Sequence, residues 1–113
     1  LPSQSTVALT MIFTAVAIVL SETTSNTAAA NMIVPIAIAV AIEAGVRPLE
    51  PALGATLGAS MGFMMPVSTP PNAIVYSSGF VPITSMMKYG LLLDIFGYVV
   101  IVALVLLLGP IVF

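Results

Sequence analysis

Hydrophobic and polar positions follow one another along this chain in long blocks. An apolar run over residues 5–20 ends in the polar segment 21–27, and a second apolar run covers residues 28–42. Each run is shorter than the about 20 residues that a membrane-spanning helix requires. Two short helices that enter from one side of a membrane and turn at residues 21–27 fit this pattern, because non-helical backbone at that depth must face protein or water. We therefore predict a re-entrant helical hairpin over residues 1–47.

Glycine and proline divide the next part of the chain. Gly45 and Pro48 predict a turn after the hairpin, and a helix is expected over residues 49–65. Three prolines within residues 66–71 stop this helix, because proline breaks the hydrogen-bond ladder of a helix interior. A short apolar segment follows. Residues 48–80 thus predict a discontinuous transmembrane helix, that is, two half-helices with a non-helical centre.

The last part of the chain is strongly apolar. Residues 81–89 predict a short interfacial helix with Lys88 at the level of the lipid headgroups, on the cytoplasmic side by the positive-inside rule. Residues 90–113 contain a continuous transmembrane helix. Small residues that recur every four positions from Gly54 to Gly62 predict close helix packing within the protein. The predicted fold class is an all-α membrane protein with a re-entrant hairpin, one discontinuous and one continuous transmembrane helix.

Composition supports a membrane protein and excludes several classes of function. Of the 113 residues, 60% are hydrophobic and 5% are charged, and the mean hydropathy is +1.24. A soluble domain has about a quarter of its residues charged, so lipid or other protein must surround most of this chain. The net charge of −2 gives no electrostatic basis for binding nucleic acid. The sequence has no cysteine and no histidine, which excludes disulfides and the usual transition-metal sites.

Two polar interruptions, Ser25–Thr27 and Ser68–Asn72, have matching chemistry. A helix that breaks inside a membrane exposes carbonyl groups at the end of its first half and N–H groups at the start of its second half. The carbonyl end suits a cation such as sodium, and the N–H end suits an anion. Thr69 is expected to cap the second half-helix, with Pro70 or Pro71 in its first turn. No basic residue lies near either interruption, so helix dipoles and co-bound cations would have to neutralise a bound anion.

Glu22 is the sole acid that we expect inside the membrane, and such residues are candidates for function. It could relay protons, pair with a cation from another part of the protein, or cap the first half-helix. We favour a structural or indirect role. Catalysis is not expected, because Ser25 has no histidine, lysine or paired acid in the same motif to activate it.

Two segments of the sequence resemble the divalent anion–sodium symporter family, whose members carry dicarboxylates, tricarboxylates or sulfate with sodium. One is Ser21–Ala28. The other matches the longer signature of this family with Ser60, Phe63, Pro66, Val67, Ser68, Asn72, Ile74 and Val75. The resemblance extends over essentially the whole chain, and places it as the C-terminal part of such a carrier.

The resemblance implies which residues bind the substrate and the coupling ion. The substrate would be contacted by Ser25, Asn26, Thr27, Thr69 and Pro70. One sodium site would use Ser21, Thr24, Asn26 and Ser68, largely through backbone oxygens. Ser68 stands where some relatives have alanine, which matters little if only its carbonyl binds.

The resemblance also implies the setting of the chain. Family members are homodimers in which a transport domain moves like an elevator against a scaffold, and two inverted repeats share the site. The first repeat would belong to a missing N-terminal part of the protein. Sodium would be the coupling ion without any organic cofactor, and the location would be a bacterial inner or plasma membrane.

These observations predict a secondary active transporter for a small divalent anion, a C4-dicarboxylate or alternatively citrate or sulfate. Two other functions remain open at this point. One is a proton-coupled or antiporting anion carrier in which Glu22 titrates. The other is a purely structural membrane subunit whose Ser, Asn and Thr side chains only hold helices together.

Overall fold

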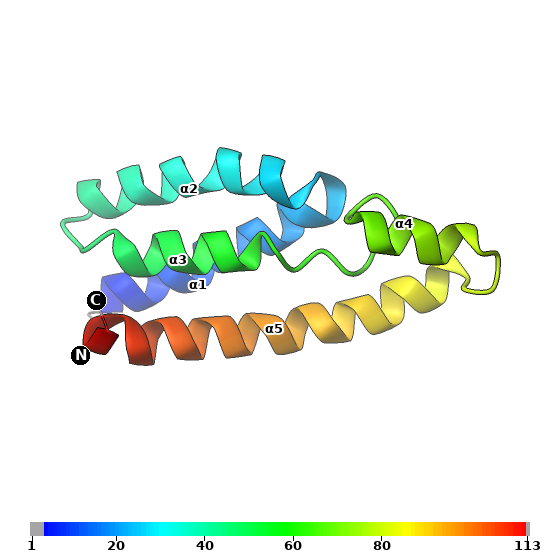
Figure 1. Cartoon of the computed structure of the whole chain (residues 1–113). Coiled ribbons are helices and arrows are strands. Elements are labelled where there is room, and N and C mark those ends of the chain that lie inside the picture. Colours follow the sequence, from blue (N-terminus) through cyan, green and yellow to red (C-terminus); the bar gives the residue numbers. More distant parts are fainter. Residues whose placement is uncertain (1–3, 113) are drawn as a thin grey trace.

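The computed structural model describes residues 4–112, and in this part the chain forms five α-helices and no strand. The expected all-helical fold class is confirmed. The expected ranges 1–47 and 90–113 also include residues 1–3 and 113, which lie outside the described residues. The bundle measures 49 × 23 × 20 Å, and α5 runs along most of its length (Figure 1). The helices are α1 (Gln4–Thr23), α2 (Asn26–Glu43), α3 (Leu49–Gly58), α4 (Pro70–Ser77) and α5 (Ile83–Val112).

Helices α1 and α2 form an antiparallel pair with a very short connection at Thr24 and Ser25 (Figure 1). With 20 and 18 residues, both helices are longer than the apolar runs from which we expected them. Helix α1 continues through Ser21 and Glu22 because these polar side chains are buried and hydrogen-bonded inside the protein. Both helices, like α5, are long and apolar enough to cross a membrane.

A glycine ends α2, as the sequence predicts. Gly45 has a positive φ of 74°, a conformation that glycine adopts at little cost. The N–H groups of Gly45 and Val46 donate to the carbonyl groups of Ile42 and Ala41. These bonds satisfy the last carbonyls of the helix, and the chain turns back into α3.

Helix α3 ends at Gly58, whereas we expected a helix over residues 49–65. From residue 59 to 69 the chain is non-helical. Side chains from other segments donate to carbonyl groups that would accept from backbone N–H groups in a longer helix. Ser21 donates to the Ala59 carbonyl, and Asn72 donates to the Gly62 carbonyl. Tertiary hydrogen bonds therefore replace helical ones before the first proline of this segment.

The glycines of α3 allow it to pack closely on α1. A Cβ atom at Gly54 would overlap the Thr14 hydroxyl, and one at Gly58 would lie 2.8 Å from the Thr14 carbonyl oxygen. Backbone-to-backbone approach of this kind is typical of small residues in membrane helices. The expected close packing within the protein is confirmed for these two glycines.

Helix α5 is one continuous helix of 30 residues. The separate interfacial helix that we expected over residues 81–89 does not form, because residues 83–89 are the first part of α5. The absence of a side chain at Gly90 lets the Phe63 carbonyl and the Met64 backbone lie directly on the helix surface. Gly90 thus allows close packing and does not mark a boundary between two helices.

Small side chains form the core, and many large apolar side chains face outward. The main cluster of buried residues includes Phe13, Ala17, Ala29, Ile33, Ala37, Ala55 and Ala59. In contrast, Phe80 is 91% exposed and Ile111 is 79% exposed. Extensive exposed apolar surface marks contact with lipid or with other protein, as the composition predicts.

Candidate functional site at two helix interruptions

The first interruption places donors at the start of α2. Ser25 is the N-cap of this helix, and its Oγ accepts a hydrogen bond from the Ala28 N–H at 3.0 Å. The backbone N–H groups of Asn26 and Thr27 have no acceptor within the helix and lie at its positive end. Only the oxygen of the Ser25 hydroxyl is used for capping, so its proton can still donate. The start of α2 can therefore offer backbone and hydroxyl donors to an anion.

The second interruption is capped in the same way but has fewer donors. Thr69 is the N-cap of α4, and its Oγ1 accepts from the Asn72 N–H at 3.4 Å. Pro70 and Pro71 occupy the first helical positions, as expected, and proline has no N–H group. The start of α4 thus contributes the positive end of its dipole and the Thr69 hydroxyl. It lacks the two backbone donors that α2 provides.

Glu22 connects the two interruptions. Its Oε2 accepts a hydrogen bond from the Met64 N–H at 3.0 Å and lies 3.1 Å from the Ser68 Oγ. The Ser68 hydroxyl also lies 2.9 Å from the Glu22 carbonyl oxygen. Glu22 and Ser68 are only 8% and 2% exposed. This is the kind of structural role that the sequence analysis favours for Glu22.

Oxygen atoms gather around Ser21 at the end of α1. Its Oγ lies 2.5 Å from the Asn26 Oδ1 and 2.7 Å from the Ala59 carbonyl oxygen. A serine hydroxyl has one proton and can satisfy only one of these oxygens at a time. The Ser21 hydroxyl at the end of α1 thus faces two acceptor oxygens, one from the Asn26 side chain and one from the Ala59 carbonyl after α3. This is the environment that a hard cation prefers.

The side chain of Asn72 makes hydrogen bonds within the second interruption. Its Nδ2 donates to the carbonyl groups of Gly62 at 3.2 Å and Met65 at 3.0 Å. Asn72 belongs to a polar interruption that could have bound an anion, but both protons of its side-chain amide have acceptors within the protein. Gly62 itself packs on the neighbouring helix, since a Cβ atom there would lie 3.0 Å from the Ser21 carbonyl oxygen.

The structure brings only some of the predicted site residues into contact. Ser21 contacts Asn26, and Ser68 contacts the adjoining Glu22. The Thr24 hydroxyl instead donates to the Leu20 carbonyl of its own helix at 2.8 Å. The predicted substrate residues lie at the surface of the described structure: Asn26 and Thr69 are half-buried, whereas Ser25, Thr27 and Pro70 are exposed.

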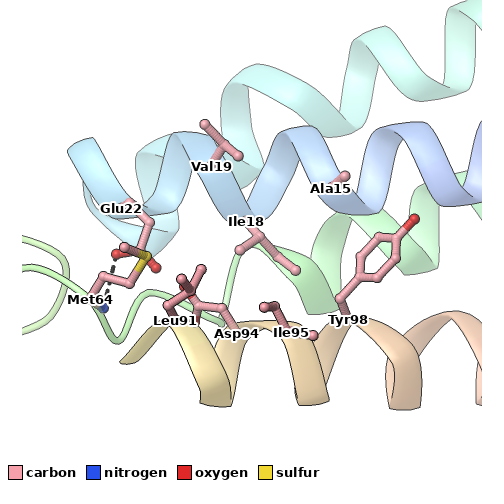
Figure 2. Close-up of a pocket in the computed structure, with 9 residues that line it drawn as sticks. All are labelled: Ala15, Ile18, Val19, Glu22, Met64, Leu91, Asp94, Ile95 and Tyr98. Carbon is pink, nitrogen blue, oxygen red and sulfur yellow. Dashed lines mark hydrogen bonds between the residues drawn. The ribbon is translucent and has the colours of Figure 1, made fainter. Parts of the chain in front are cut away.

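A second acid, Asp94 of α5, lies beside Glu22. Both line a cavity of about 230 Å³ between α1 and α5, together with Met64 from the non-helical segment (Figure 2). Asp94 is 3% exposed. The expectation that Glu22 is the sole acid inside the membrane is therefore wrong. Asp94 lies near Lys88 in the sequence, but in the fold its side chain is buried. No local sequence pattern predicts this burial.

Comparisons with known proteins identify the family of this chain. The family profile described as "Sodium:sulfate symporter transmembrane region" matches residues 2–113. The chain is 38% identical over 106 residues to the sodium-dependent dicarboxylate transporter SdcS of Staphylococcus saprophyticus, covering 94% of this chain and 20% of that protein. It is 37% identical over 92 residues to SdcS of Staphylococcus aureus MRSA252, covering 81% of this chain and 18% of that protein.

The chain thus spans about a fifth of the length of these relatives. Its apolar helices and its bacterial relatives support the expected location in a bacterial inner or plasma membrane. The match of the family profile over nearly every residue settles its classification: the chain belongs to the sodium:sulfate symporter family.

Proposed function

We propose that this chain forms half of the transport site of a sodium-coupled carrier for a small divalent anion, with a C4-dicarboxylate as substrate. The observation that carries the proposal is the junction of two helix interruptions through Glu22 and Ser68. It joins the carbonyl ends of α1 and α3 to the segment that leads into α4. Relatives named sodium-dependent dicarboxylate transporters support the choice of ion and substrate.

The anion binds at the starts of α2 and α4. The N–H groups of Asn26 and Thr27 and the hydroxyl of Ser25 donate to one carboxylate. Thr69 adds its hydroxyl, and Pro70 presents an apolar ring beside it. The prolines of α4 remove backbone donors there, so α2 makes the stronger contribution to anion binding.

Sodium binds on the carbonyl side of the same interruptions. The ligands are oxygens of Ser21, Thr24, Asn26 and Ser68, and most of them are backbone carbonyls. A cation close to Ser21 would relieve the excess of acceptors around its hydroxyl. Thr24 contributes through its backbone, because its hydroxyl already donates to Leu20.

Sodium also replaces the basic residue that an anion site normally has. Arg47 is paired with Glu50 at 3.3 Å, and Lys88 lies over the ring of Tyr89. Each helix terminus supplies only about half an elementary charge. A divalent anion therefore needs bound sodium nearby, which couples the binding of the two ligands.

The hairpin of α1 and α2 is re-entrant, and α3 and α4 are halves of one discontinuous transmembrane helix. A helix of 20 residues is about 30 Å long, whereas the bundle is 49 Å long. Helix α4 and the start of α5 extend beyond the turn between α1 and α2 (Figure 1). The turn thus lies partway along the bundle. In the complete protein these elements move as one body of an elevator-type homodimer, as the family resemblance implies.

Thermal unfolding of the full-length protein tests this function. Succinate, citrate and sulfate are compared in sodium, potassium and choline salts. A bound ligand stabilises a protein by RT ln(1 + [L]/Kd), about 2.7 kcal/mol at a hundredfold excess over Kd. Succinate should raise the melting temperature in sodium only. An equal increase in choline would refute sodium coupling, and no response to any anion would refute the anion site.

Two variants separate a transport site from a purely structural role. Asn26→Ala removes a side-chain oxygen beside the proposed sodium site, and Thr69→Ala removes the hydroxyl that we propose contacts the anion. Both should weaken the stabilisation by succinate more than they lower the melting temperature of the unliganded protein. A structural subunit predicts the reverse, with lower folding yield and unchanged ligand affinity in the protein that folds. Asn31→Ala, at an exposed position of α2, is the matched control.

A further inference from the structure

The cavity between α1 and α5 contains buried carboxylate oxygens without a partner. Glu22 is 8% exposed and Asp94 is 3% exposed. The Glu22 Oε1 and both carboxylate oxygens of Asp94 make no hydrogen bond within the described structure. Figure 2 shows both side chains among those that line the cavity. Two adjoining acids can share one proton, but this still leaves one negative charge in an apolar cavity, which is strongly unfavourable without a positive group.

The chain's own basic residues do not supply this group. The sequence has two of them, Arg47 and Lys88. Arg47 contacts the Glu50 carboxylate at 3.3 Å and the Gly109 carbonyl oxygen at 3.2 Å. Lys88 is exposed, with its Nζ 5.5 Å from the centre of the Tyr89 ring. The compensating charge must therefore come from outside this chain segment.

The lining of the cavity indicates what kind of group fits. Apart from the two acids, its wall is almost wholly apolar, with side chains such as Ile18, Leu91 and Ile95. The hydroxyl of Tyr98, also in the lining, already donates to the Met11 carbonyl at 3.0 Å. A bare hard cation takes about six oxygen ligands, which this wall does not provide. A long side chain with an apolar stem and a charged head matches it better.

We infer that this cavity receives an arginine or lysine side chain from a membrane helix outside residues 4–112, which pairs with Asp94 and Glu22. The head of either side chain has one positive charge and at least three N–H donors, which suits two acids that share one proton. The chain covers 20% of the length of its Staphylococcus saprophyticus relative, so such a carrier has room for further helices. The contact would hold α1 and α5 against the rest of the protein, next to Ser68 of the proposed sodium site, which is hydrogen-bonded to Glu22.

A search for coupled variants in the full-length protein tests this inference. Each arginine and lysine in the other membrane helices is replaced by methionine, with and without Asp94→Asn. Asp94→Asn should lower the melting temperature by several degrees. One basic-residue variant should lower it similarly, and the combination should restore most of the loss, because contacting residues are not additive. Glu43→Gln, at an exposed acid of α2, should change little.

Cross-linking tests the same contact with both acids intact. Leu91→Cys, at the wall of the cavity, is combined in a cysteine-free protein with a cysteine beside each candidate base. A disulfide should form at one helix only, the one that carries the coupled base. No coupled base and no disulfide would overturn the inference. A second result would also overturn it: the unsubstituted protein loses stability when choline replaces sodium, and the Asp94→Asn variant does not. The cavity would then hold a free cation.

Discussion

The hydroxyl of Ser68 lies 2.9 Å from the carbonyl oxygen of Glu22 and 3.1 Å from its carboxylate, although the two residues are 46 positions apart. This contact joins the end of α1 to the non-helical segment before α4. Because both residues are buried, water does not compete for the hydroxyl. The pair therefore fixes how the two interruptions sit relative to one another.

Ser68→Ala should lower stability without abolishing sodium dependence. The variant loses one donor to Glu22, at a cost of about 1 kcal/mol, but keeps the backbone carbonyl that we propose as the sodium ligand. Thermal unfolding and a sodium titration of succinate binding measure the two effects. Ser78→Ala, which removes an exposed hydroxyl, is the control. A large loss of sodium affinity at unchanged stability would show that the side chain itself binds sodium.

Glu22→Gln should retain sodium-dependent uptake. The amide oxygen of glutamine can still accept from the Met64 N–H, whereas the residue can no longer exchange a proton. Uptake of labelled succinate into vesicles that contain the full-length protein is the measurement. Uptake that is lost in this variant, while the protein remains folded and still binds succinate with sodium, would favour the proton-coupled carrier instead.

Two substitutions at Ser25 separate helix capping from anion binding. Asparagine and aspartate cap helices about as well as serine, so both variants should keep the melting temperature of the unliganded protein. Ser25→Asp places a negative charge where we propose that a carboxylate binds, and should abolish stabilisation by succinate. Ser25→Asn should weaken it only modestly. Equal stabilisation of both variants would show that no anion binds at the start of α2.

Asn72→Ala should destabilise the protein and have little direct effect on the anion. It leaves the carbonyl groups of Gly62 and Met65 without their donors, and an unsatisfied buried acceptor costs about 1–3 kcal/mol. The melting temperature should fall clearly, while the residual protein keeps its succinate affinity. Asn31→Ala again serves as the control. A selective loss of succinate affinity would instead place Asn72 in the substrate site.

Local sequence chemistry predicts the positions of the interruptions well. Ser25 and Thr69 are typical N-cap residues, and Pro70 is typical of the first turn of a helix. Each signal depends on a few neighbouring residues and their own backbone. That is why Thr69 caps α4 as the sequence predicts. Ser25 caps α2 by the same chemistry, although we had considered Glu22 for that role.

Contacts between distant residues were not predictable in the same way. From the sequence we expected a helix to begin at Gly90, but its lack of a side chain instead allows the close approach of the Phe63 backbone. Asp94 is near Lys88 in sequence, yet the fold places it next to Glu22 in one cavity. The carbonyl of Ala59 gives no sequence signal at all, because every residue has one. Such groups become recognisable only when the packing of α1, α3 and α5 is known.

Gly58→Ala should be strongly destabilising, because the new methyl group has no space. The ideal Cβ position lies 2.8 Å from the Thr14 carbonyl oxygen, and backbone cannot move aside as a flexible side chain can. Overpacking of this kind costs about 1–3 kcal/mol, which exceeds the about 1 kcal/mol that alanine gains over glycine in a helix. Gly109→Ala is the matched control, because its Cβ would meet the flexible Glu50 side chain at 3.3 Å. Thermal unfolding of the two full-length variants should therefore differ by several degrees. Similar melting temperatures would mean that α1 and α3 separate easily, and that the junction of the two interruptions does not depend on their close packing.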